Sequence, residues 1–243
     1  MRWTMRFISG FSAGVLLVVM LTSCETTPPA EGSLAANRSA PDQTEIGPSP
    51  VNERSRRSQA DWAAAIDGLS FETGLVVVQQ PPATSDMAEA RRLMEQGQTE
   101  HAANRRTEAV AAYAAAVRAA PDLPEAYAAL GEAMIAKGKT DLAIACYRTV
   151  IGMQPENIEA RVELANALAR EMRYEEATSE MEAALVLDPE HGPAHERLAI
   201  WSYYDEDYAT AWAHVRAARA AGHEMPPQFI TLLSKKMPEP GAR

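Results

Sequence analysis

Apolar residues recur at helical spacing from about residue 90 to residue 225, and short polar stretches divide them into successive segments. Three prolines, Pro121, Pro155 and Pro189, stand 34 residues apart, and each one follows a pair of such segments. Proline ends a helix because it lacks an N–H and disfavours helical backbone in the residue before it. A fixed period of this length predicts an array of helix pairs in which each pair packs on the next.

The period also aligns small and large residues in columns when the chain is written in rows that begin at residues 90, 124, 158 and 192. A column of small residues consists of Gly97, Gly131, Ala165 and Ala199. A column of larger apolar residues consists of Tyr113, Tyr147, Met181 and Val215. We expect the small residues where the two helices of one pair approach most closely, with the larger residues filling the space between the helices.

Each row contains a polar stretch where its helix pair should turn: Asn104–Arg106, Lys137–Thr140, Glu171–Tyr174 and Asp205–Asp207. The fourth row lacks a proline in register and ends at Gly222. Residues 228–237 then carry an apolar stripe that consists of Phe229, Ile230, Leu233 and Met237. An amphipathic helix at the end of an array covers the apolar surface of the last repeat, so residues 226–243 are predicted to be a capping helix and tail.

The repeated pattern resembles the tetratricopeptide repeat (TPR) over residues 90–225. The resemblance implies an all-α fold, a right-handed TPR superhelix (α-solenoid) of about four helix-turn-helix repeats with a C-terminal capping helix. One position departs from the family pattern. The family's aromatic residue near the start of the first helix is Tyr127 in the second row, whereas the other rows carry Leu93, Arg161 and His195.

In the TPR family, the first helices of the repeats line a concave groove that binds a peptide. The resemblance therefore implies these groove candidates: Met94, Gln98, His101, Glu132, Ile135, Val162, Asn166, Arg170, Ile200, Tyr203 and Tyr204. Tyr203 and Tyr204 are the strongest candidates, because tyrosine offers a rigid apolar face with a polar tip, although at least one of them can instead pack on the capping helix. The candidates are acidic to mixed in charge, so we expect an extended or helical peptide with some positive charge.

Chaperone-type TPR proteins hold a C-terminal carboxylate with lysine and asparagine side chains in this groove. The matching positions of this chain carry Met94, Gln98, Glu159 and Glu163. These side chains cannot form that clamp, so a terminal carboxylate is not the expected ligand.

The first residues are predicted to be a targeting segment. Arg2 and Arg6 frame the start of an uncharged apolar run, residues 7–21, which is shorter than the roughly 20 residues of a membrane span. The tetrapeptide Leu21-Thr22-Ser23-Cys24 follows and resembles the lipobox of bacterial lipoproteins. The resemblance implies a lipoprotein signal peptide in residues 1–23, lipidation of Cys24 by diacylglycerol and an N-acyl chain such as palmitate, and a stable membrane anchor. Glu25 in place of aspartate favours the outer membrane, at its periplasmic face.

Residues 24–58 are rich in Pro, Ser, Thr and Ala and show no apolar periodicity, which predicts a disordered tether. Asp61 is placed to cap a short helix that carries Trp62, and residues 71–80 have an extended pattern. Residues 59–89 therefore either pack on the first repeat as an N-terminal cap, which repeat arrays need, or form a loosely ordered segment that pairs with a partner.

Charge and motifs exclude several function classes. The chain has 33 acidic and 23 basic residues, a net charge of −10, and a nucleic-acid binder needs a concentrated basic face. Phosphate-binding loops, nucleophile elbows and metalloprotease helices are absent from the sequence. Gly192-Pro193 separates His191 from His195, which argues against a zinc site, and Cys146 is expected to be a buried structural residue. We expect no enzyme, cofactor, metal, nucleic acid or small-molecule substrate.

These features together predict a membrane-anchored TPR lipoprotein that acts as a protein–protein interaction scaffold or assembly factor in the bacterial cell envelope. Its partner would be another envelope protein or a peptide segment of one. An alternative is a structural, self-associating envelope protein that uses its convex face or residues 59–82. A third and less favoured class is a soluble secreted TPR protein.

Overall fold

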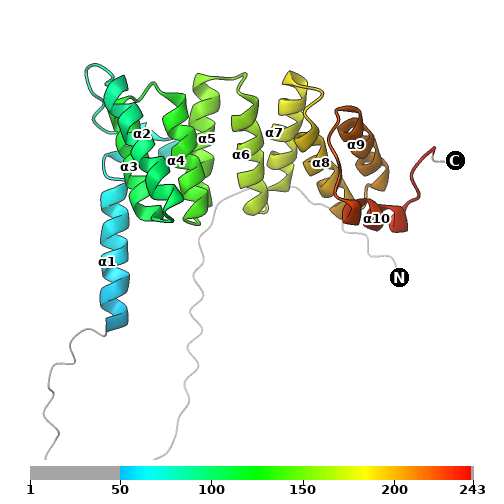
Figure 1. Cartoon of the computed structure of the whole chain (residues 1–243), viewed down its shortest axis with the longest axis horizontal. Coiled ribbons are helices and arrows are strands. Elements are labelled where there is room, and N and C mark those ends of the chain that lie inside the picture. The colour runs from blue at the N-terminus through cyan, green and yellow to red at the C-terminus, as the bar shows by residue number, and fades with distance from the viewer. Residues whose placement is uncertain (1–49, 242–243) are drawn as a thin grey trace, which may run out of the picture. The chain divides into compact units, whose positions relative to one another are not determined.

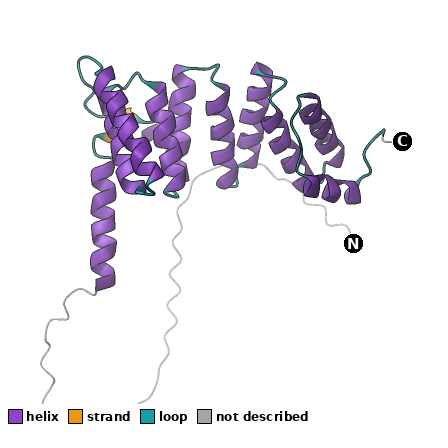
Figure 2. Cartoon of the chain, viewed as in Figure 1, coloured by secondary structure: helices purple, strands orange, loops and turns teal. Residues whose placement is uncertain are grey.

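The computed structural model describes residues 50–241, and these residues form ten α-helices, one short 3₁₀ helix and a two-stranded antiparallel sheet (Figures 1 and 2). The predicted signal peptide, Cys24 and residues 24–49 of the predicted tether lie outside the described residues. The elements are α1 (Pro50–Ala65), β1 (Leu69–Ser70), η1 (Glu72–Gly74), β2 (Val77–Val78), α2 (Met87–Ala102), α3 (Arg106–Ala119), α4 (Pro124–Ala136), α5 (Thr140–Met153), α6 (Ile158–Arg170), α7 (Tyr174–Leu187), α8 (Gly192–Tyr204), α9 (Tyr208–Ala220) and α10 (Pro227–Lys236).

Helices α2 to α9 form four helix pairs that stack in chain order (Figure 1). Helices α4, α6 and α8 begin at residues 124, 158 and 192, where the rows of the sequence pattern begin, and α2 begins at Met87, just before residue 90. Within each pair the first helix packs against the second, and the second helix then packs against the first helix of the next pair. The result is an all-α solenoid, as the period predicted.

The turn inside each pair contains one residue with positive φ, again every 34 residues. These residues are Asn104 (φ 58°), Gly138 (φ 74°), Met172 (φ 58°) and Glu206 (φ 62°). Left-handed backbone lets the chain reverse within a few residues, but it is strained for a residue with a Cβ. The fold therefore imposes this conformation at a fixed place in the repeat, whether or not a glycine is present.

The second helices end in two different ways. Helices α3, α5 and α7 end on residues with φ between −132° and −137°, each followed by the proline of its row. Helix α9 ends without a proline, and Gly222 (φ 76°) reverses the chain there. The chain then enters α10, which buries Phe229 and Leu233 beside Trp212 of α9.

The small-residue column lies where the two helices of a pair meet. A Cβ added at Gly97 would be 2.5 Å from a ring carbon of Tyr113, and one added at Gly131 would be 2.9 Å from the ring of Tyr147. Ala165 and Met181 are fully buried together in the third pair, where a smaller partner leaves room for the methyl group. Each small residue of the first helix is thus in contact with the large residue of the second helix in the same repeat.

The position near the start of each first helix where the TPR family has an aromatic residue carries different residue types in this chain, but two of them make the same hydrogen bond. The Tyr127 hydroxyl donates to the carbonyl oxygen of Pro121 at 3.0 Å. Thirty-four residues later, the guanidinium of Arg161 donates to the carbonyl of Pro155 at 3.0 Å. The hydrogen bonds tie the first helix of a repeat to the proline that closes the previous one, so tyrosine and arginine are interchangeable in this role.

The N-terminal segment differs from its predicted structure. Helix α1 begins at Pro50 and not at Asp61, so residues 50–58 of the predicted tether are helical; proline is tolerated in the first helical turn because the N–H there has no partner. The predicted extended run contains only two-residue strands, which pair Leu69 with Val78 and are joined through η1.

This segment packs on the second helices of the first two repeats. Helix α1 contacts α3, η1 contacts α5, and Ala65, Leu69 and Val76 are buried in the main core. The backbone N–H of Val76 donates to the Thr149 hydroxyl of α5 at 2.9 Å, and Arg118 of α3 donates to the carbonyl of Asp67 at 2.5 Å. Residues 59–82 therefore cover one side of the array and do not close its end alone.

Candidate functional site

Two hollows follow the first helices of the repeats. The α6–α8 hollow has a volume of about 540 Å³ and is lined by Ile135, Glu163, Asn166, Ala167, Ala169, Arg170, Tyr174, Arg197, Ile200, Trp201 and Tyr204. The α4–α6 hollow has a volume of about 440 Å³ and is lined by Ala128, Ala129, Glu132, Tyr147, Asn157, Glu159, Ala160 and Glu163. Because Glu163 lines both, the hollows adjoin along α6, and together they are called the groove below.

One face of each first helix supplies the lining. On α6 the residues that face the α6–α8 hollow include Glu163, Asn166, Ala167 and Arg170, at the three- and four-residue spacing of one helix face. The same positions recur on α8 34 residues later as Arg197, Ile200, Trp201 and Tyr204. The opposite face of α6 carries Leu164, Ala165 and Leu168, which are buried and hold the helix in the array.

Two arginines give the α6–α8 hollow its positive charge. Arg170 and Arg197 form no ion pair within residues 57–241. By contrast, the nearby arginines Arg148, Arg161 and Arg173 are each paired with Glu176 or Glu180. Asn166 adds an amide to the same wall. Guanidinium groups present a planar fork of donors that matches a carboxylate, so this wall suits an anionic group.

Carboxylates dominate the α4–α6 hollow, where Glu132, Glu159 and Glu163 line one space. Partial burial raises the pKa of the Glu163 carboxyl above its ordinary value. The negative charges of Glu159 and Glu132 add to the rise, whereas hydrogen bonding with Asn166 and the positive charge of Arg197 oppose it. Burial also raises the pKa of Tyr147, with a further contribution from Glu163. The groove therefore changes from negative at α4 to positive at α8.

Exposed apolar side chains form the rim of the α6–α8 hollow. Tyr204 is 77% exposed and Tyr174 is 51% exposed, and both line the hollow. Met172, also 77% exposed, lies beside Tyr174 in the turn before α7. Large apolar side chains that share one exposed patch usually mark an interaction surface.

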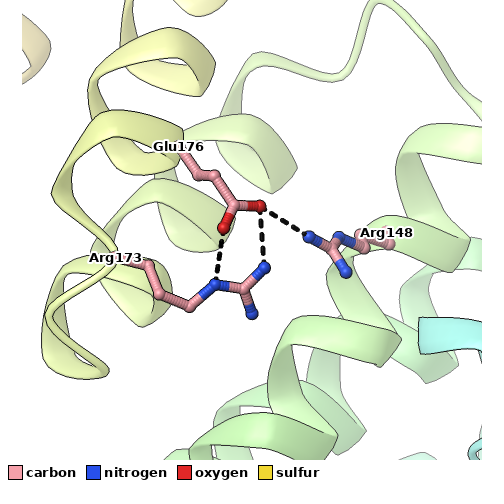
Figure 3. A network of polar contacts seen from close by, with 3 residues as sticks. All are labelled: Arg148, Arg173 and Glu176. Atoms are coloured by element: carbon pink, nitrogen blue, oxygen red, sulfur yellow. Dashed lines mark hydrogen bonds and ion pairs between the residues drawn. The ribbon is translucent and has the colours of Figure 1, made fainter. Parts of the chain in front are cut away.

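A polar network holds the start of α7 next to this rim (Figure 3). Glu176 accepts two hydrogen bonds from Arg173, both at 2.7 Å, and one from Arg148 of α5 at 3.2 Å. The three side chains are partly exposed, so their contribution to stability is small. Their geometric effect is to tie the second helices of two successive repeats together beside Tyr174.

The structure brings six of the predicted groove residues together in the groove: Glu132, Ile135, Asn166, Arg170, Ile200 and Tyr204. Met94, Gln98 and His101 lie on α2 and line neither hollow. Val162 is 7% exposed and packs in the core with Met181 and Leu198.

Tyr203 faces the capping helix, as the alternative for this tyrosine pair predicted. Its ring centroid lies 5.8 Å from that of Phe229 in α10 and 5.7 Å from that of Tyr208 in α9. A step of one residue rotates a side chain by about 100° around a helix, so adjacent residues face different surroundings. Tyr204 consequently lines the groove, whereas Tyr203 is partly buried and packs against the core of the last repeat.

Sequence reasoning missed Arg197, Trp201, Tyr174 and Tyr147 as groove residues. The period itself contains the signal for two of them, because Arg197 and Trp201 stand 34 residues after Glu163 and Ala167. The rotation of α6 about its axis could not be read from the period. Without it, the period places Val162 and Tyr203 in the groove, whereas Val162 is 7% exposed and Tyr203 packs on the capping helix.

Other types of site find no support in the part of the chain that the structure describes. Within residues 57–241, no group of three or more His, Cys, Asp or Glu side chains is arranged to hold a metal ion. No helix in the described range is long and apolar enough to cross a membrane. Cys146 is fully buried, and burial raises the pKa of its thiol, so it is a structural residue.

Comparison with known families and structures agrees with the repeat pattern. Residues 134–199 match the family described as "Tetratricopeptide repeat". Among solved structures, the TPR protein YrrB superposes with a TM-score of 0.51 at 22% identity, covering 63% of this chain and 77% of that one. MamA gives a TM-score of 0.54 at 18% identity, covering 61% and 82%. MamA from Desulfovibrio magneticus RS-1, residues 41 to the end, gives 0.51 at 20% identity, covering 55% and 75%.

A search of curated proteins found no match for this sequence. The family match and the structural neighbours define the fold as an all-α TPR solenoid. They indicate no enzyme family, and TPR proteins are generally interaction modules without catalytic activity.

Proposed function

We propose that the groove binds a segment of another protein and that the chain acts as an interaction scaffold. One observation carries the proposal: the α6–α8 hollow combines the exposed rings of Tyr174 and Tyr204 with two arginines that have no ion-pair partner in residues 57–241. Buried aromatic and arginine anchors typically dominate the energetics of a protein interface. Both kinds of anchor are already present on rigid helices.

The position of the groove also favours this function over self-association through residues 59–82. That segment buries Leu69 and Val76 against its own array, so most of its apolar residues already have an intramolecular partner. On α8, Ile200 and Trp201 are only partly buried against the core, and Tyr204 is 77% exposed at the groove. The TPR protein YrrB, which shares this fold, is described as having "an unusual peptide-binding site", which is consistent with a peptide ligand for such an array.

We further propose that the scaffold is a lipoprotein of the bacterial cell envelope. The support is the sequence alone: the apolar run at residues 7–21 is followed directly by Leu21-Thr22-Ser23-Cys24. A diacylglycerol on the Cys24 thiol and an acyl chain on its amine would anchor the array to the outer membrane. The partner would then be another envelope protein, held near the periplasmic face.

Site-specific photocrosslinking in intact cells tests the groove. A photoreactive residue in place of Tyr204 is expected to crosslink a defined partner, and the crosslink should disappear when Arg197→Glu is added. The same residue in place of Val186 is the control, because Val186 is 82% exposed on α7 but lines neither hollow. Equal crosslinking from both positions, or insensitivity to Arg197→Glu, would contradict a groove-bound partner.

Labelling with radioactive palmitate tests the anchor. We expect the parent chain and Cys146→Ser to incorporate the label and to sediment with membranes, and Cys24→Ser to do neither. Glu25→Asp should move the protein from the outer to the inner membrane fraction if the residue after the cysteine directs sorting. Membrane attachment of Cys24→Ser equal to that of the parent would overturn the lipoprotein assignment.

A further inference from the structure

The two ends of the groove carry opposite charges. Glu132, Glu159 and Glu163 line the α4–α6 hollow, whereas Arg170 and Arg197 line the α6–α8 hollow. Packing of the repeats does not require this change of charge, because the corresponding solvent-facing positions can carry any polar residue. The 34-residue column that contains Glu163 carries Arg197 in the next repeat, so the reversal occurs at one and the same place on the helix surface.

Among the described residues, these charges have little compensation within the array: only the Glu163 carboxylate is partly stabilised, by Asn166 and by the positive charge of Arg197, which lines the same hollow. None of the five side chains forms an ion pair within residues 57–241, whereas Glu176, Glu180 and their arginine partners on neighbouring surfaces do. Carboxylates that share one hollow repel one another, as do two arginines that share the next. Like charges held together without an ion pair of their own are unfavourable in the free protein, and a ligand of complementary charge would relieve both repulsions.

We infer that the groove recognises an extended segment of another protein that carries both a basic and an acidic side chain, the basic one in the α4–α6 hollow and the acidic one in the α6–α8 hollow. This inference rests on the proposed function and names the chemistry of the ligand. It extends the expectation from sequence, which was a peptide with some positive charge, by adding the acidic residue that Arg170 and Arg197 require.

The geometry of α6 sets the separation of the two charges. Arg170 follows Glu163 by seven residues, which is about 10 Å along a helix. An extended chain covers that distance in about three residues. Between the charges, apolar side chains of the segment would meet Ile200, Trp201 and the ring of Tyr204. We assign the carboxylate to an internal side chain of the segment and not to a chain terminus. The reason is that the lining continues past Arg170 to Tyr174, so the bound segment can extend beyond the acidic residue.

Fluorescence anisotropy with synthetic peptides tests the inference on the full-length protein. The probes are labelled ten-residue peptides, N-acetylated and C-amidated, with the same Leu and Tyr residues and two charged positions separated by three residues. Four probes carry Lys then Glu, Glu then Lys, two Lys, or two Glu. We expect one of the two mixed-charge probes to bind about tenfold more tightly than both like-charge probes, and its affinity to fall as salt is raised.

Substitutions in the groove test which side chains bind the charged residues of the preferred probe. Arg197→Gln should weaken the preferred probe about tenfold and should not weaken a version of that probe whose Glu is replaced by Gln. Arg216→Gln is the matched control, because Arg216 is exposed on α9 and lines neither hollow. The double variant Glu159→Gln, Glu163→Gln should likewise weaken binding of the preferred probe and should not weaken binding of a version whose Lys is replaced by Gln.

The outcomes separate this inference from the proposed function. Tight binding that is independent of charge but lost in Tyr204→Ala would overturn the inference and leave the groove intact. Binding of none of the probes would overturn the groove itself. Two further probes test other occupants: a peptide with a free C-terminal carboxylate and no acidic side chain, and a peptide of residues 34–46 of this chain, which contains Arg38 and Asp42. Tighter binding of either one than of the mixed-charge probes would overturn the inference.

Discussion

The imidazole of His195 is hydrogen-bonded to the carbonyl oxygen of Pro189, with 3.0 Å between Nε2 and the oxygen. A carbonyl oxygen only accepts hydrogen bonds, so Nε2 carries the proton. Tyr127 and Arg161 make the corresponding bond to Pro121 and Pro155. Three different side chains thus perform one task, which is to donate from the first helix of a repeat to the proline that closes the preceding repeat.

Removing one of these donors should destabilise the array. We expect Tyr127→Phe to lower the free energy of unfolding by about 1 kcal/mol, because the Pro121 carbonyl loses its hydrogen bond while the buried ring is kept. Urea denaturation followed by circular dichroism measures the change. Tyr204→Phe is the control, since no hydrogen bond to its hydroxyl is found within the described residues, and an equal loss in both variants would contradict the role of the bond.

The stability of the last repeat should depend on pH through His214. Its Nδ1 lies 3.0 Å from Nδ1 of His195, and burial, with the nearby His195, lowers the pKa of His214 below the ordinary value of about 6.5. As pH falls through 6.5, the unfolded chain binds a proton that the folded chain does not bind, so the free energy of unfolding decreases. The decrease continues down to the lower pKa of the folded protein and is not recovered below it.

Urea denaturation at pH 7.5 and pH 5.5 tests this dependence. The parent chain should be less stable at the lower pH, and His214→Gln should lose less stability between the two values because glutamine does not titrate and can still donate to His195. An unchanged difference between the two pH values in His214→Gln would show that His214 is not responsible.

The contact between Gly97 and Tyr113 should be sensitive to a single methyl group. A Cβ at Gly97 would lie 2.5 Å from the Tyr113 ring, so we expect Gly97→Ala to cost about 1–3 kcal/mol of stability through overpacking. The third repeat has Ala165 with Met181 at these two positions. The double variant Gly97→Ala, Tyr113→Met should therefore be less destabilised than the sum of its single variants. Strict additivity in a double-mutant cycle would mean that the two residues do not compete for the same space.

The turn between α6 and α7 offers a stabilising substitution. Met172 has φ 58° and is 77% exposed, whereas the second repeat has Gly138 at the same position. Left-handed backbone costs a residue with a Cβ roughly 1–2 kcal/mol, so Met172→Gly should raise the free energy of unfolding by up to about 1 kcal/mol after the greater chain entropy of glycine is subtracted. The reverse change, Gly138→Met, should destabilise by a similar amount. A Met172→Gly variant that is less stable than the parent would show that the methionine makes packing contacts that outweigh the strain.

The predictions from sequence were most accurate for features with local causes. Proline ends a helix through its own backbone, and the period places α4, α6 and α8 at their observed first residues. The apolar stripe that begins at Phe229 predicted α10 for a similarly local reason, since an amphipathic helix needs a surface to cover. Helix α1 begins before the position that its sequence predicts, because Pro50 occupies the first helical turn, where proline is tolerated.

The sequence by itself determined the number of helix pairs, their ends and the place of the cap, because backbone preferences and apolar periodicity act over a few residues. The tertiary structure decided which face of each first helix borders the groove, since one residue changes the direction of a side chain by about 100°. That rotation places Glu163 and Tyr204 in the groove, Val162 in the core and Tyr203 against the capping helix. Packing between helices also decided that Arg170 and Arg197 share one hollow and that neither forms an ion pair within residues 57–241, which no local pattern contains.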